Sequence, residues 1–209
     1  MVKAAIGIRA HSGWGAVVVV AGGPGAIGVV QRSKVVISAP KISGARQPYH
    51  FAKAQLDAQL DKIQGLLEAE RYLAGCGAES ERLAWEALRE ISIEAARSDT
   101  EVGGCAILLA SGRSLPPLPK ILASHALIHT AEGEFFRQSF WRAAERLNLR
   151  LTGIRERDLD GQTRNAFGPQ ADSLNREIAG LGSSIGPPWT ADQKNACLAA
   201  LLVLAGSSG

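Results

Sequence analysis

The chain has 209 residues, of which 46% are hydrophobic and 21% charged, and its formal net charge is +3. This composition excludes a disordered chain, and the small net charge excludes a protein that coats DNA by charge alone. The length suits a single domain, 1–209. Three widely spaced cysteines and the lack of an apolar stretch of about 20 residues predict reduced thiols, a cytoplasmic location and no membrane segment.

The first part of the chain predicts an antiparallel meander. Residues 3–37 contain three β-rich segments separated by "HSG" and "GGPG", which are typical of turns. A helical insertion of about 50–98 follows. Apolar residues at helical spacing predict a first helix, "GCGAESE" at 75–81 is expected to end it, and Ser80 is expected to cap a second helix. The two helices would form a hairpin.

Strands and helices alternate in the second half. Continuous apolar character at 102–112 predicts a buried strand, and 149–156 predicts another after a helix at 120–147. The mixed charges of "RERDLDGQTR" suggest a solvated loop, and the last helix starts with a capping box, Thr190 and Gln193. This order predicts an α/β fold with a five-stranded mixed sheet, an antiparallel meander followed by parallel strands, flanked by helices.

Two stretches, "AIGIRAHSGWGAVVV" and "DQKNACLAALL", resemble the opening hairpin and the last helix of the ribonuclease H-like superfamily. That superfamily includes Holliday-junction resolvases and the sugar-kinase and actin group. The resemblance implies a ribonuclease H-like fold, and in its nucleases two metal ions are held by carboxylates at the sheet edge. "SHALIHTAEGE" with "GPPWTADQK" is also similar to a group of bacterial proteins, for which the resemblance assigns no activity.

The resemblance places the metal-binding acids at positions where this chain differs. Arg9 stands at the end of the first strand, and Ser111 and Arg113 stand at the end of the fourth, so that only Asp192 matches. An arginine keeps its positive charge and would repel Mg²⁺. We therefore expect a degenerate site that has lost its metal ions. Either the arginines are free to bind a ligand, or they form internal ion pairs, Arg9 with Asp192 or Arg113 with Glu132.

The leading hypothesis is a cleft that binds an anionic ligand, a nucleic acid or a nucleotide, with no cofactor. Such a ligand can be bound by guanidinium and ammonium groups and by the amides at a helix N-terminus. An imidazole beside a tyrosine could stack on a base or form a hydrogen bond with it. The residues expected to bind it are Arg9, Arg113, Lys194 and His50. His11, in the turn after the first strand, is a candidate general base, and Asp192 is expected to orient an arginine.

A second hypothesis places a divalent metal on the helix at 120–147. His125, His129 and Glu132 are spaced i, i+4 and i+7, which puts them on one helical face and makes them candidate ligands for Mg²⁺, Mn²⁺ or Zn²⁺ in a hydrolase or nuclease. Asp192 or His50 would complete the site, with Glu132 also catalytic. Alternatively, backbone carbonyls or Glu132 satisfy the imidazoles of a partly buried polar face. A third hypothesis is an interaction protein that forms a homodimer through the helices at 50–98.

Overall fold

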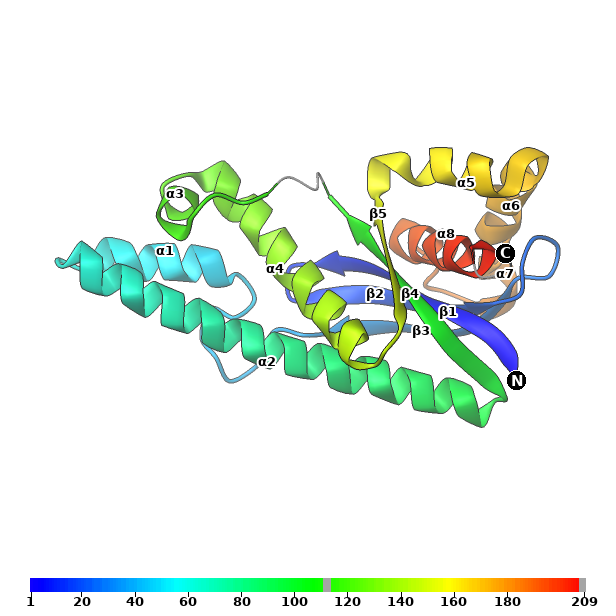
Figure 1. Ribbon diagram of the computed structural model, residues 1–209, viewed down its shortest axis with the longest axis horizontal. Coiled ribbons are helices and arrows are strands. Elements are labelled where there is room, and N and C mark those ends of the chain that lie inside the picture. The colour runs from blue at the N-terminus through cyan, green and yellow to red at the C-terminus, as the bar shows by residue number, and fades with distance from the viewer. Residues whose placement is uncertain (111–113, 207–209) are drawn as a thin grey trace.

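A computed structural model describes residues 1–110 and 114–206 (Figure 1). Its centre is a five-stranded sheet with the order β3-β2-β1-β4-β5. The strands are β1 Val2–His11, β2 Trp14–Ala21, β3 Gly28–Val36, β4 Thr100–Leu109 and β5 Arg150–Arg155. β1, β2 and β3 pair in antiparallel fashion, whereas β4 is parallel to both β1 and β5. The predicted mixed sheet is therefore confirmed, and its order is that of a ribonuclease H-like fold.

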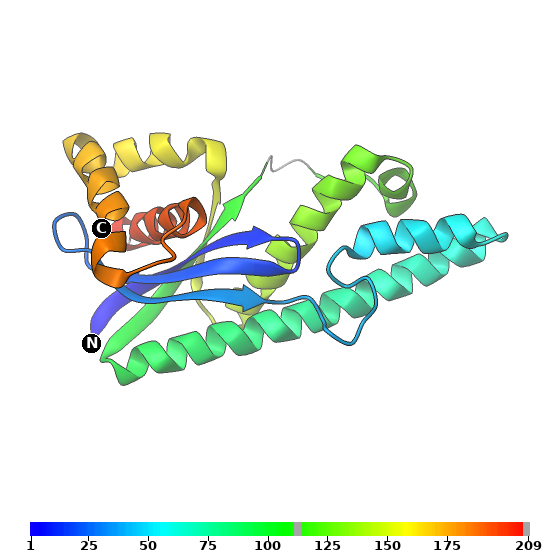
Figure 2. The same ribbon diagram turned by 180° about the vertical axis from the view of Figure 1, so that it is seen from behind.

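Helices cover both faces of the sheet. They are α1 Pro48–Ala58, α2 Lys62–Arg97, α3 Leu118–Leu122, α4 His125–Arg146, α5 Leu159–Phe167, α6 Ala171–Gly180, α7 Gly182–Ile185 and α8 Ala191–Ala205. Short 3₁₀ turns occupy Glu156–Asp158 and Gly168–Gln170. α2 and α4 pack on one face, and α8, backed by α5 and α6, packs on the other (Figures 1 and 2). α1 and the start of α2 extend past the sheet as an arm.

Successive side chains of β1 point to opposite faces of the sheet and contribute to the two halves of the core. Ile6 and Ile8 are fully buried beneath α2 and α4, together with Phe136 and Phe140. Gly7 points to the opposite face, where a Cβ atom would lie 1.8 Å from the carbonyl oxygen of Ala196 in α8. Because a side chain at this position would collide with backbone, glycine is what lets α8 lie directly on the sheet.

The predicted break at 75–81 is wrong, because α2 runs without interruption through Gly75 and Gly77. A buried stripe that includes Leu73, Cys76 and Ser80 continues across this segment at helical spacing. Packing of that stripe outweighs the roughly 1 kcal/mol that each helical glycine costs. The actual break lies at 59–61, where the Asp61 side chain accepts from the backbone N–H groups of the first turn of α2. The predicted hairpin of two helices divided at 75–81 is therefore wrong, and Ser80 does not cap a helix; α1 instead packs against α2 across the break at 59–61.

Three other local predictions have different outcomes. The helix expected at 120–147 is divided into α3 and α4, because Ser124 caps α4. The stretch predicted to be a solvated loop instead contains the end of β5, a 3₁₀ turn and the start of α5, in which Leu159 and Thr163 are buried. The capping box of Thr190 and Gln193 is confirmed. Among the described residues, no helix has both the length and the apolar character that crossing a membrane requires.

Candidate functional site

Polar side chains from three elements meet at one edge of the sheet. Arg9 and His11 stand at the end of β1, Glu156 directly follows β5, and Asp192 lies in the first turn of α8. Parallel strands present their carboxyl ends at the same edge, which brings the ends of β1 and β5 together there. We call these four residues the sheet-edge cluster.

Arg9 is paired with both carboxylates of the sheet-edge cluster. Its Nε and Nη2 atoms each donate to Glu156 over 3.1 Å, and its Nη1 atom donates to Asp192. The hydrogen bonds to Glu156 and Asp192 raise the pKa of Arg9, and the bond to Glu156 makes the largest contribution. The Arg9 side chain is 26% exposed, that of Glu156 40% and that of Asp192 24%, so the ion pairs are partly shielded from water. One fixed positive charge therefore faces two carboxylates.

His11 completes the sheet-edge cluster. Its Nε2 atom lies 3.2 Å from Nη1 of Arg9 and 2.9 Å from Oδ2 of Asp192. Its ring stacks on Trp14 with centroids 4.3 Å apart and an interplanar angle of 12°. A guanidinium can only donate and a carboxylate can only accept, so the protonation state of Nε2 decides which of the two His11 binds. A general-base role for His11 and an orienting role for Asp192 stay predictions.

The sheet-edge cluster does not fit a two-metal carboxylate site. Of the alternatives for Arg9, the internal ion pair with Asp192 is present, and Glu156 adds a second. A permanent cation thus occupies the space between the only carboxylates that the described residues bring to this cluster. Lys194, also in the first turn of α8, forms no ion pair with the described carboxylates. Ser111 and Arg113 lie outside the described residues.

Sequence reasoning missed Glu156, although a signal for it was present. It directly follows a strand predicted to be parallel to the fourth, so its side chain belongs at the same edge as Arg9. The mixed charges around it concealed this position.

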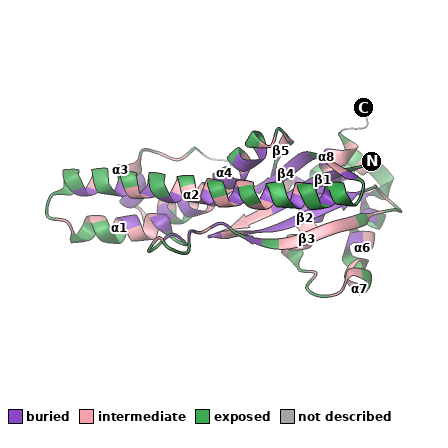
Figure 3. Ribbon diagram, turned by 90° about the horizontal axis from the view of Figure 1, so that it is seen from below, coloured by how far each residue is buried: buried purple, intermediate pink, exposed green. Residues whose placement is uncertain are grey.

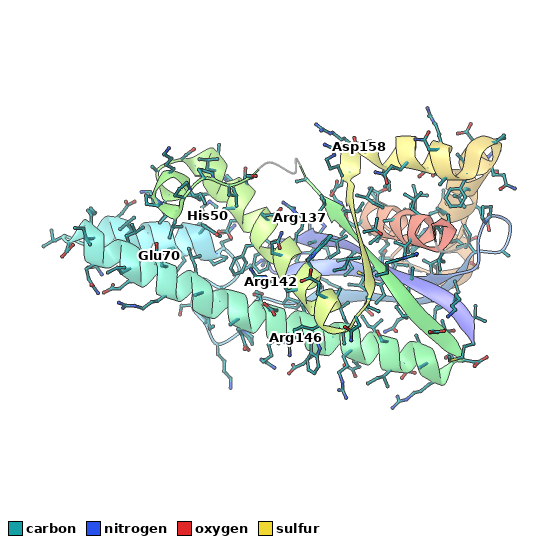
Figure 4. The ribbon with its side chains drawn as sticks, viewed as in Figure 1. His50, Glu70, Arg137, Arg142, Arg146 and Asp158 are labelled. Atoms are coloured by element: carbon teal, nitrogen blue, oxygen red, sulfur yellow. The ribbon has the colours of Figure 1, made fainter. Side chains whose placement is uncertain are left out.

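A second cluster lies on the arm, where α1 meets α4 (Figure 4). His50 belongs to α1, and His125 and His129 belong to the first two turns of α4. One nitrogen from each ring lies within 4.8 Å of the others, close enough to hold a metal ion together. The ring centroids are 4.4 Å apart for the α4 pair and 4.8 Å apart for His50 and His129. We call these three residues the histidine centre.

Glu132 lies behind the histidine centre. Its Oε1 atom accepts from Nδ1 of His50 and from the backbone N–H of the same residue, each over 3.0 Å. The side chain is only 3% exposed, and burial raises the pKa of Glu132 while the His50 hydrogen bonds oppose that rise. Its Oε2 atom has no hydrogen-bond partner among the described residues. The third nitrogen beside the α4 pair thus comes from His50, and Glu132, expected there as a ligand, instead contacts His50.

The contact with Glu132 determines which nitrogen of His50 is available. A carboxylate accepts the proton on Nδ1, which leaves the lone pair of Nε2 free to bind a metal. His125 and His129 are exposed, and their rings form no hydrogen bond with the described part of the chain. The alternative interpretation was that backbone carbonyls or Glu132 satisfy the imidazoles of this face. Within the described part of the chain, neither does so for His125 and His129, whereas Glu132 does accept from His50.

The histidine centre and the sheet-edge cluster are separate. His50 was expected to join Arg9 in binding an anion, but its polar contacts are with Glu132 of α4. Figure 4 shows His50 beside the arm helices, whereas Asp158, next to the sheet edge, lies at the start of α5. The sheet edge and the arm must therefore be assessed as independent sites.

Comparisons with known proteins assign this chain no activity. No protein-family model and no curated protein matches the sequence. Among solved structures, RuvC of Thermus thermophilus is similar over 99% of this chain and 95% of its own, with a TM-score of 0.48 and 13% sequence identity. The order and direction of the strands assign the chain to the ribonuclease H-like fold class. A likeness this distant carries no argument about what the chain binds or does.

Proposed function

We propose that this protein is a transition-metal-binding protein of ribonuclease H-like fold, with one divalent ion held by the histidine centre. One observation carries the proposal: three imidazole nitrogens from two helices lie within 4.8 Å of one another, with a buried carboxylate bound to the back of one ring. Metal-ligating histidines commonly donate their other ring N–H to such a carboxylate. Glu132 would then orient His50 and strengthen it as a ligand.

The ligand chemistry selects among the metals that the sequence left open. Imidazole nitrogen suits zinc and its neighbours, whereas Mg²⁺ prefers oxygen ligands. Zn–N bonds of about 2.0–2.1 Å in a tetrahedral site place ligand nitrogens about 3.3 Å apart. The three histidine nitrogens are at most 4.8 Å apart, so they must move closer together to bind one ion. The exposed rings of His125 and His129 have room to rotate for this. Zn²⁺ is therefore the ion we propose.

Three protein ligands leave a coordination position for solvent or substrate. Zinc sites of this open kind lower the pKa of their bound water to about 7 and perform hydrolysis. This feature favours the hydrolase hypothesis, with His50, His125 and His129 as ligands and Glu132 as the residue that positions His50.

The geometry gives less support to anion binding at the sheet edge. Arg9 already faces two carboxylates, so binding a phosphate would require breaking ion pairs that are partly shielded from water. A nucleic acid or nucleotide partner, a homodimer and a cytoplasmic location stay predictions from the sequence.

Calorimetric titration of Zn²⁺ into metal-free protein tests the proposal. We expect one ion per chain, and at least a tenfold loss of affinity in His50→Ala and in His129→Ala. His11→Ala is the matched control, because it removes the one histidine outside the histidine centre and should leave zinc affinity unchanged. Absence of zinc binding, or equal affinity in all these variants, would overturn the proposal.

A further inference from the structure

Helix α1 is weakly held by its own residues. It has 11 residues, and only Pro48 and Ala52 are buried. Isolated helices shorter than about 12–15 residues are marginal in water, so α1 depends on the elements against which it packs. Those elements are α2, α3 and α4. Figure 3 shows α1 as a mixture of exposed, intermediate and buried ribbon, and the adjoining start of α2 as largely exposed.

The N-terminus of α1 is capped by another helix. Gln47, at the N-cap position, makes no side-chain hydrogen bond to the helix. Glu132 of α4 takes over this task by accepting from the backbone N–H of His50. Tyr49 adds apolar contacts at this end, because its ring lies edge-on to Phe135 at 6.1 Å between centroids and packs against the cluster that contains Ile121 and Ile128. One buried carboxylate therefore provides the polar contact that joins α1 to α4.

The histidine centre spans this same junction. One ring belongs to α1 and two belong to α4. An ion bound to all three would link α1 directly to α4, a few ångströms from the Glu132 cap. If α1 moved away, two ligands would remain, and the affinity for the ion would fall accordingly.

We propose that occupancy of the histidine centre controls the docking of α1 against α4. We call this reversible metal link between α1 and α4 the clasp. This inference rests on the proposed metal centre. An ion that binds only the docked state multiplies the ratio of docked to undocked molecules by about 100 when its concentration is 100 times its dissociation constant. Removal of the ion returns α1 to its weaker intrinsic docking.

Undocking would uncover apolar surface. α1 covers a cluster in which Leu73 of α2 and Leu122 of α3 are buried. Leu60 and Ile63, at the turn between α1 and α2, are already 101% and 78% exposed. Loss of the ion would therefore add the residues of this cluster to the apolar side chains that the arm already exposes, and binding of a hydrophobic dye would report it.

Hydrogen exchange measured by mass spectrometry tests the clasp. Zinc should slow exchange of the amides in 48–58 at least tenfold in the wild-type protein, because opening of a weakly held helix limits their protection. Amides of α8, which packs directly on the sheet, should not change. His125→Ala removes a ligand on α4 without altering α1 and should abolish the zinc effect, whereas His11→Ala should retain it.

A second variant adds a rescue experiment. Glu132→Gln weakens the cap on α1 and should accelerate exchange of 48–58 in the metal-free protein, and zinc should restore protection toward the wild-type level. If zinc binds the wild-type protein by calorimetry but leaves exchange of 48–58 unchanged, the clasp is refuted and the metal centre stands. If zinc does not bind at all, both the metal centre and the clasp are refuted.

Discussion

Substitution of Arg9 by alanine would leave Glu156 and Asp192 without the cation that separates them. Loss of one partner costs about 0–1 kcal/mol for exposed ion pairs and about 3–5 kcal/mol for buried ones. Because 26% of the Arg9 side chain and 24% of the Asp192 side chain are exposed, an intermediate cost applies. We expect a loss of about 2 kcal/mol, which corresponds to a decrease in Tm of about 4–8 °C for a chain of this length.

Thermal unfolding followed by circular dichroism measures this decrease. Arg9→Lys should recover part of the loss, since it restores the charge without the guanidinium fork that binds Glu156 through two nitrogens. Arg157→Ala is the control, because Arg157 is 68% exposed and should contribute little. Mn²⁺ should stabilise Arg9→Ala more than the wild type, because the freed carboxylates can then bind a cation. An unchanged Tm in Arg9→Ala would refute the idea that this arginine holds the sheet-edge cluster together.

Three further predictions concern the scaffold. Arg32→Ala should destabilise the protein by about 1–3 kcal/mol in denaturant titrations, because its guanidinium donates to the backbone carbonyls of Ile185, at the end of α7, and Gly186, which follows it. These carbonyls would lose their partner, and no change in stability would contradict this. Gly7→Ala should cost more than about 3 kcal/mol, since its Cβ would collide with α8; a stable variant with an unshifted unfolding midpoint would refute this close approach. Burial raises the pKa of Cys105 and Cys197 to about 12, so both thiols should resist alkylation at mildly alkaline pH. Rapid alkylation of the native protein, measured by mass spectrometry, would contradict their burial. The stability that the protonated thiols contribute is present below the pKa of these thiols in the unfolded chain, and it is lost as pH rises through about 12.

The sheet could be predicted from the sequence because its strands have strong local signals. β-rich segments separated by the turns "HSG" and "GGPG" mark β1 to β3, and an uninterrupted apolar stretch marks β4. Helix boundaries were less predictable, since tertiary packing decided them. Gly75 and Gly77 indicate a break when they are considered alone, yet α2 continues through both because its buried stripe does.

The histidine centre was only partly predictable for a similar reason. The i, i+4 spacing of His125 and His129 is local and was recognised. The third ring comes from His50, which the sequence offered together with Asp192 as a residue to complete the site. The choice between the two depends on how α1 docks against α4, which no local pattern encodes. The same limit applies to Glu156, which reaches Arg9 only through the pairing of distant strands.

X-ray absorption spectroscopy of the zinc-loaded protein tests the central claim most directly. The account predicts three imidazole nitrogens at about 2.0–2.1 Å with an oxygen from solvent completing the shell. Loss of one imidazole contribution in His50→Ala would confirm that α1 supplies a ligand. A shell of oxygens alone, sulfur scatterers at about 2.3 Å, or a spectrum unaffected by His50→Ala would contradict the account.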